Sequence, residues 1–108
     1  MENIYNPTDL TLREVVYNGF TVVGGAAGFI ETDVSAVIPG NARLSWWNCY
    51  SAAVQKVGVR NTGSAIDTKH DANASVHNAT GIARVIAGKV DLYRSAADNT
   101  YYCLGYIR

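Results

Sequence analysis

Side chains that could hold a metal ion gather in one polar stretch, residues 62–78, which we expect to form a long loop. Asp67, His70, Asp71 and His77 lie within it. A catalytic metal site needs about three convergent ligands and a second layer of hydrogen bonds that orients them. Nothing in the spacing brings these four side chains together, and a solvated loop with two ordinary histidines explains them much better than a metal site does. We therefore predict no metal site and no cofactor.

The sequence also contains no clear candidate for a catalytic nucleophile or for an acid–base pair. Ser64 and Cys49 do not lie in sequence contexts that activate a nucleophile. Glu31 and Asp33 would share one face of a strand, as an acid pair or calcium ligands do, but a solvent-facing edge gives the same pattern. Gly24–Gly28 lacks the lysine and the helix of a phosphate-binding loop. We predict no catalytic residue, and hence not an enzyme.

Aromatic side chains could provide a binding surface, either by stacking on a sugar or by burial against another protein. Neighbouring residues on a strand point to opposite faces, so one of Trp46 and Trp47 must point inward and the other outward. The same alternation puts Tyr102 and Tyr106 on one face of the last strand. Core packing accounts for most of these aromatic residues. An outward tryptophan beside these tyrosines is also compatible with a subunit interface and, third, with a glycan platform.

Length and composition describe one small domain with an unusually uncharged surface. The chain has 108 residues, of which 48% are hydrophobic and 17% charged. Soluble domains typically carry about 25% charged residues. A surface with few charges is readily covered by neighbours, which favours assembly. A small β domain rich in Thr, Asn and Gly would have a similar composition.

The charge balance argues against nucleic acid and membrane partners. Nine basic residues balance nine acidic ones, and the basic residues are scattered along the chain. A nucleic-acid-binding protein normally shows a basic patch. No stretch approaches the ~20 apolar residues that cross a bilayer. The start of the chain lacks the basic and apolar regions of a signal peptide, so we expect a protein made in a cytoplasm.

The order of strand-forming runs and turn residues predicts an all-β fold. Asn18–Gly19 is typical of a tight hairpin, which would pair residues 13–17 with residues 20–23. The turns recur at the spacing expected of an antiparallel β-sandwich or barrel, with about eight strands. The expected strands are residues 13–17, 20–23, 29–34, 42–50, 55–60, 79–86, 89–93 and 101–107.

One segment admits a second interpretation. Leu44, Trp47, Ser51, Val54 and Val57 fall near helical spacing. The aromatic residues of the same segment prefer a pleated, half-buried surface, and the Pro-Gly turn before it supplies no helix cap. We therefore expect a strand here.

The first twelve residues differ from the rest, which divides the chain into an extended N-terminal arm, residues 1–12, and a sandwich domain, residues 13–108. Ile4, Tyr5 and Leu10 are apolar residues among turn-forming ones. Such an arm is either disordered or ordered by packing on another subunit. In the second case these three side chains would bind the partner.

The only two cysteines, Cys49 and Cys103, each lie in an aromatic strand-forming run. Two reduced, buried thiols are the expected state in a reducing compartment. A disulfide between them is the alternative. Their wide separation excludes the Cys-x-x-Cys arrangement of redox and zinc sites.

Three segments, Asp33–Gly40, Gly58–Ser64 and Tyr101–Tyr106, resemble a small jelly-roll-like β-sandwich domain that recurs in virion proteins of tailed bacteriophages. That domain occurs in head decoration proteins and in tail-fibre modules. The likeness covers about residues 28–108. It implies a structural or adhesive role in a virion assembled in the host cytoplasm, without catalytic residues.

The resemblance and the composition together predict the partners. They are copies of the chain itself, as a homo-oligomer with a trimer as the expected form, and the major capsid protein or tail proteins. Closed symmetry would cover sheet edges that are otherwise exposed. Binding of glycans, on a host receptor or elsewhere, is the alternative function.

Overall fold

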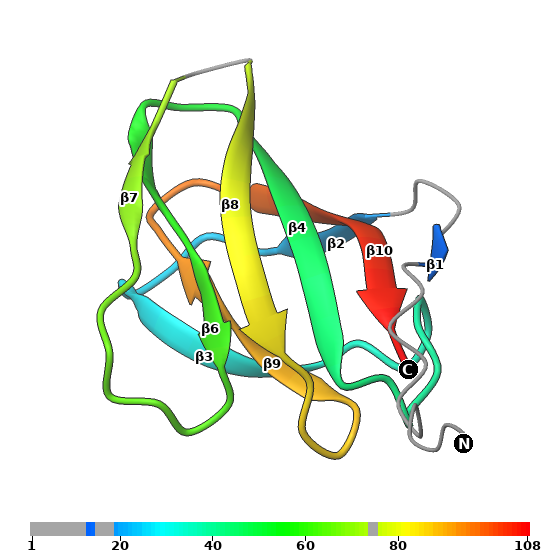
Figure 1. Cartoon of the computed structure of the whole chain (residues 1–108). Helices are drawn as coiled ribbons and strands as arrows, with labels where there is room; N and C mark the ends of the chain where they lie inside the picture. Colours follow the sequence, from blue (N-terminus) through cyan, green and yellow to red (C-terminus); the bar gives the residue numbers. More distant parts are fainter. Residues whose placement is uncertain (1–12, 15–18, 74–75) are drawn as a thin grey trace, which may run out of the picture.

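The computed structural model describes residues 13–14, 19–73 and 76–108, and all regular elements among them are β-strands (Figure 1). Residues 1–12, predicted to form the arm, lie outside the described residues. None of the described residues belongs to a helix long and apolar enough to cross a membrane. The strands are β1 (Arg13–Glu14), β2 (Gly19–Val22), β3 (Gly28–Asp33), β4 (Leu44–Ser51), β5 (Gln55–Val57), β6 (Val59–Asn61), β7 (His70–Ala72), β8 (His77–Arg84), β9 (Lys89–Arg94) and β10 (Asn99–Ile107).

The strands form two main sheets, and every pairing is antiparallel. In the first sheet β10 is central: β4 and then β8 follow on one side, and β1 and β2 pair with successive parts of its other edge. The second sheet has the order β3-β9-β6, and β5 pairs with β7. Only Gly58 separates β5 from β6, so β7 extends the second sheet through β5.

Taking β1 with β2 and β5 with β6 as interrupted strands gives eight strands in a jelly-roll arrangement. One sheet then reads β1/β2-β10-β4-β8 and the other β3-β9-β6/β5-β7. The all-β sandwich prediction is confirmed. The strand at residues 42–50 is also confirmed, because β4 alternates buried and half-buried side chains along its whole length.

The predicted hairpin at Asn18–Gly19 is wrong. β1 and β2 do not pair with each other; both pair antiparallel with β10, β1 at Tyr106 and β2 at Tyr102. The long terminal strand leaves one edge open along its length, and two short strands satisfy more of its backbone groups there. Asn18 itself lies outside the described residues.

The polar stretch at residues 62–78 is also more regular than the predicted loop. It contains β7 and the start of β8. β7 pairs with β5, and Ala72 is buried in the core. Backbone hydrogen bonding and one small apolar residue are sufficient to form this strand, although its sequence is polar.

The core lies between the two sheets, and Trp47 and Tyr101 are its largest fully buried side chains. Trp47 Nε1 donates a hydrogen bond to Ser45 Oγ at 2.6 Å, and Ser45 Oγ donates to the Ala83 carbonyl at 3.0 Å. These two linked hydrogen bonds satisfy the indole N–H inside an apolar region, where an unpaired donor would be costly.

The Tyr101 hydroxyl joins the two sheets. It donates to the Tyr93 carbonyl of β9 at 2.7 Å and accepts a hydrogen bond from the Gly58 N–H at 3.2 Å. Burial raises the pKa of this phenol, so the neutral donor is the stable form. Tyr101 itself belongs to β10 in the first sheet, so one oxygen atom bonds to backbone groups of the second.

The β8–β9 connection is a two-residue turn, Ala87–Gly88, in which both residues have positive φ, 52° and 75°. Ile86 and Lys89 exchange backbone hydrogen bonds of 3.1 and 3.0 Å across it. These are the features of a type I′ hairpin. Alanine in this conformation costs roughly 1 kcal/mol, because its Cβ approaches the following carbonyl oxygen.

Removing the Tyr101 hydroxyl tests its role between the sheets. We expect Tyr101→Phe to lower the free energy of unfolding by about 2 kcal/mol, because the buried Gly58 N–H loses its acceptor. Tyr106→Phe is the matched control, since no hydrogen bond of its hydroxyl occurs among the described residues. Chemical denaturation followed by fluorescence measures both variants. Equal stability of the two would contradict this role.

Candidate functional site

The first sheet has an outer face, defined here as the side chains that point away from the core. On β4 every second residue is half-buried and alternates with core residues. β10 shows the same alternation from Asn99 to Cys103. The outer face comprises Leu44, Trp46, Asn48 and Tyr50 of β4, Thr100, Tyr102 and Leu104 of β10, and Ile82 and Arg84 of β8.

An apolar area occupies part of the outer face. Trp46 of β4 lies directly opposite Ile82 of β8 on one side and Gly105 of β10 on the other. Ile82 is 54% exposed and Leu104 is 46% exposed. Exposed apolar side chains next to a half-buried tryptophan are typical of protein interfaces, where aromatic anchors supply most of the binding energy.

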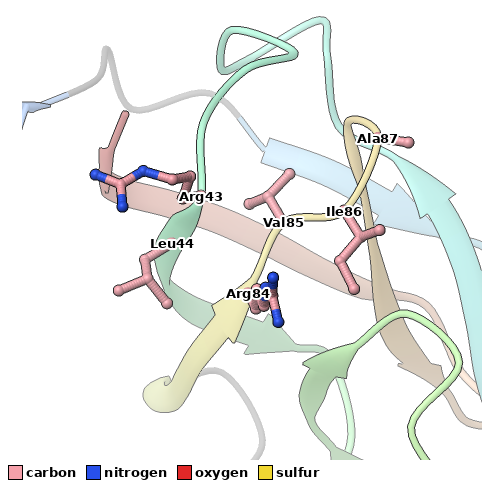
Figure 2. Close-up of a pocket in the computed structure, with 6 residues that line it drawn as sticks. All are labelled: Arg43, Leu44, Arg84, Val85, Ile86 and Ala87. Atoms are coloured by element: carbon pink, nitrogen blue, oxygen red, sulfur yellow. The ribbon is translucent and has the colours of Figure 1, made fainter. Parts of the chain in front are cut away.

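A pocket of about 480 Å³ adjoins this face, where β4 begins and β8 ends (Figure 2). The lining residues are Arg43, Leu44, Arg84, Val85, Ile86 and Ala87. Antiparallel pairing brings the two strand ends together. Leu44 lies opposite Arg84, and the Val85 N–H donates to the Arg43 carbonyl at 2.8 Å.

The pocket combines positive charge with apolar walls. Arg43 Nη2 donates to the Arg108 carbonyl at 2.5 Å, and neither Arg43 nor Arg84 forms an ion pair among the described residues. Figure 2 shows the Arg43 and Arg84 side chains extending from the two different chain segments that line the pocket. No described acidic residue lines the pocket. Guanidinium groups bind carboxylate and phosphate oxygens with charge-assisted hydrogen bonds. A ligand that carries an anionic group beside an apolar group would therefore fit this pocket.

The predicted alternation of the tryptophans is confirmed. Trp47 is 2% exposed and belongs to the core, whereas Trp46 is half-buried on the outer face. Trp47 therefore belongs to neither a glycan site nor an interface.

Tyr102 lies on the outer face as predicted, but the prediction that Tyr106 shares this face is wrong. β10 contains a bulge between Cys103 and Gly105, which adds one residue relative to β4. Beyond the bulge Tyr106 lies opposite the buried Ser45 and packs against the core. One extra residue reverses which side chains face the core, and composition carries no sign of it.

The candidate metal ligands do not converge. Among the described residues no group of three or more His, Cys, Asp or Glu side chains could hold a metal ion. Asp67 pairs with Lys69, and Asp71 pairs with Lys56 at 2.5 Å. These lysine hydrogen bonds lower the pKa of both carboxyl groups. The side chain of His77 lies outside the described residues, whereas the Nε2 atom of His70 is buried without a hydrogen-bond partner.

Glu31 and Asp33 have structural partners on the edge strand β3. Glu31 Oε2 lies 3.6 Å from Lys89 Nζ. Asp33 Oδ1 accepts a hydrogen bond from the Ser35 N–H at 2.9 Å, and hydrogen bonds from Ser35 lower the pKa of this carboxyl. Both side chains are exposed. The arrangement is that of a solvated strand edge.

Cys49 and Cys103 are free and buried, as expected. Burial raises the pKa of the Cys49 thiol to about 12 and that of Cys103 to about 11. Because the thiolate is the reactive form, neither cysteine is a nucleophile near neutral pH.

Sequence reasoning did not single out Arg43 and Arg84 as site residues. Both lie at the ends of predicted strands, but only the pairing of β4 with β8 brings them to one pocket. The predicted partner-binding residues Ile4, Tyr5 and Leu10 lie outside the described residues.

No family model, curated protein or solved structure gives a significant match to the chain.

The buried thiols make a prediction about reactivity and pH. We expect iodoacetamide to leave Cys49 and Cys103 unmodified in the native chain at mildly alkaline pH and to modify both after unfolding. Their folded pKa values lie above the ordinary value of 9.0, so the unfolded chain loses these protons first. The free energy of unfolding should therefore fall as pH rises from about 9 towards 11.

Mass spectrometry and denaturation at several pH values measure these effects. The buried Tyr101 phenol adds to the same alkaline loss of stability, because its pKa is also raised. Cys49→Ala should therefore reduce the pH dependence without removing it. Rapid alkylation of the native chain would contradict the assignment of both thiols as inert.

Proposed function

We propose that the chain is a non-enzymatic structural subunit of a virion, of the capsid-decoration or tail-appendage type, which binds the shell or tail surface as a multimer. Its place is in the virion, after assembly in the host cytoplasm. The partners are copies of itself, with a trimer as the expected form, and major capsid or tail proteins.

The observation that carries the proposal is the apolar area of the outer face. Ile82 and Leu104 expose apolar surface beside the half-buried Trp46 on hydrogen-bonded strands. Because the strands hold these side chains on an ordered backbone, association with a matching surface requires little further ordering. Covering them with another subunit would remove apolar surface from water, which is the main driving force of association.

Two sequence features support the virion setting. The first is the resemblance of Asp33–Gly40, Gly58–Ser64 and Tyr101–Tyr106 to the jelly-roll-like domain of tailed-phage virion proteins. The second is the low charged fraction of 17%, which suits a subunit covered by neighbours. The genes that flank this one provide a separate test. Capsid or tail genes beside it would support the setting, and a neighbourhood of metabolic genes would contradict it.

Charges placed on the outer face test the interface. We expect the double variant Ile82→Glu, Leu104→Glu to weaken self-association by ~10-fold or more, because two buried carboxylates would lack partners. Val54→Glu is the control, since Val54 is 73% exposed but lies between β4 and β5, outside this face. Molar mass measured by light scattering over a concentration series reports the result, with circular dichroism to verify folding. Unchanged association of a folded double variant would remove this face from the interface.

A glycan-binding module is the second candidate, and the half-buried Trp46 on the outer face favours it. Trp46 shares the outer face with Tyr102, so both rings lie on one side of the sheet. If the chain binds sugars here, a glycan array should give hits that Trp46→Ala abolishes, because the stacking surface is lost. Tyr106→Phe should keep the hits, since Tyr106 packs against the core. An array without hits for the unaltered chain would end this candidate.

A further inference from the structure

In the pocket beside the outer face, most guanidinium N–H groups of Arg43 and Arg84 have no hydrogen-bond partner among the described residues. A guanidinium group has five N–H donors, and Arg43 uses one contact on the Arg108 carbonyl. Arg84 lies across the strand pair from Leu44, which is half-buried, and Ile86 is 42% exposed. A ligand that suits this pocket supplies a carboxylate for the arginines and an apolar side chain for Leu44 and Ile86.

Residues 1–12 of the chain have this composition. They hold two of the nine acidic residues, Glu2 and Asp9, and none of the nine basic ones. Each acidic residue has an apolar residue close by in sequence, Ile4 for Glu2 and Leu10 for Asp9. In an extended segment residues two apart point to the same side, so Glu2 and Ile4 would meet one surface together.

The topology places the start of β1 at the pocket end of the sheet. Arg13 lies opposite Tyr106 and Glu14 opposite Gly105, so β1 runs antiparallel to the last residues of β10. The next residue of β10, Ile107, lies opposite Leu44 of the pocket. The chain therefore enters β1 from the end of the sheet at which the pocket lies. Twelve extended residues reach up to ~40 Å, which is enough to reach a neighbouring copy.

We propose that this pocket binds residues 1–12 of a second copy of the chain. The Glu2 carboxylate bonds to Arg43 or Arg84, and Ile4, which an extended segment directs to the same side as Glu2, packs on Leu44 and Ile86, while Asp9 adds a second carboxylate to the segment. When each copy passes this segment to the next, the same contact repeats around a ring, which is compatible with the trimer of the proposed function. The inference rests on the proposed self-association and names the site that accepts the segment.

Charge exchange in the full-length chain tests the contact. The pocket variant is Arg43→Glu, Arg84→Glu, and the segment variant is Glu2→Arg, Asp9→Arg. Each variant alone should weaken self-association by about tenfold or more, because like charges would then meet at the contact. A mixture of the two should associate between unlike chains, since each pocket then faces a segment of opposite charge. Lys56→Glu is the control for a charge reversal elsewhere on the surface, because Lys56 lies on β5 and pairs with the exposed Asp71.

Sedimentation of the single chains and of the mixture, with one chain fluorescently labelled, gives the result. Recovery to within about threefold of the unaltered chain in the mixture alone supports docking on a second copy. A quadruple variant, which carries all four exchanges in one chain, completes the set. If it alone recovers, with no association in the mixture, the segment binds the pocket of its own chain and the inference is overturned. If every variant associates as the unaltered chain does, the pocket is not the docking site, while the proposed function stands. If the unaltered chain is monomeric at all concentrations, self-association itself is refuted.

Discussion

The hydroxyl group of Tyr101 is the contact on which the sandwich most depends. It bonds to the Tyr93 carbonyl and the Gly58 N–H of the opposite sheet, and all three groups are buried. Asn99 extends this polar network: its Nδ2 atom donates to the same carbonyl, and its Oδ1 atom accepts from Gln55 Nε2 at 2.8 Å. Because the groups satisfy one another, the apolar core can close around them at little cost. They also fix the relative position of the sheets, which apolar packing specifies less strictly.

That fixed position determines what the first sheet presents to its surroundings. Once Trp47 and the two cysteines point inward, strand alternation directs Trp46, Tyr50 and Tyr102 to the other side. An aromatic-rich strand pair thus supplies both the core and an apolar exterior. The same sheet ends in the arginine-lined pocket, so apolar surface and positive charge adjoin. This combination is the basis for the proposed binding of another macromolecule.

The sequence was sufficient to predict the features that follow from local patterns. The strand at residues 42–50, the burial of one tryptophan of the pair and the eight-strand sandwich all follow from alternation and turn spacing. Features that depend on which strands pair with each other could not be predicted from local sequence patterns. The Asn18–Gly19 hairpin was wrong because long-range pairing with β10 outcompeted a local turn preference. Tyr106 was assigned to the wrong face because a bulge has no compositional mark. The pocket arginines belong to strands that only the fold makes neighbours.

The strained Ala87–Gly88 turn has a consequence for how sequences of this fold can vary. Asparagine or glycine would relieve the backbone strain at position 87, so neutral drift should replace alanine often unless something opposes the change. Position 87 borders the pocket, where an added amide group would occupy space and introduce competing polarity. Retention of alanine there among natural variants would be evidence of selection for a small, apolar rim. Frequent asparagine would indicate that the rim evolves freely and that only the hairpin geometry is preserved.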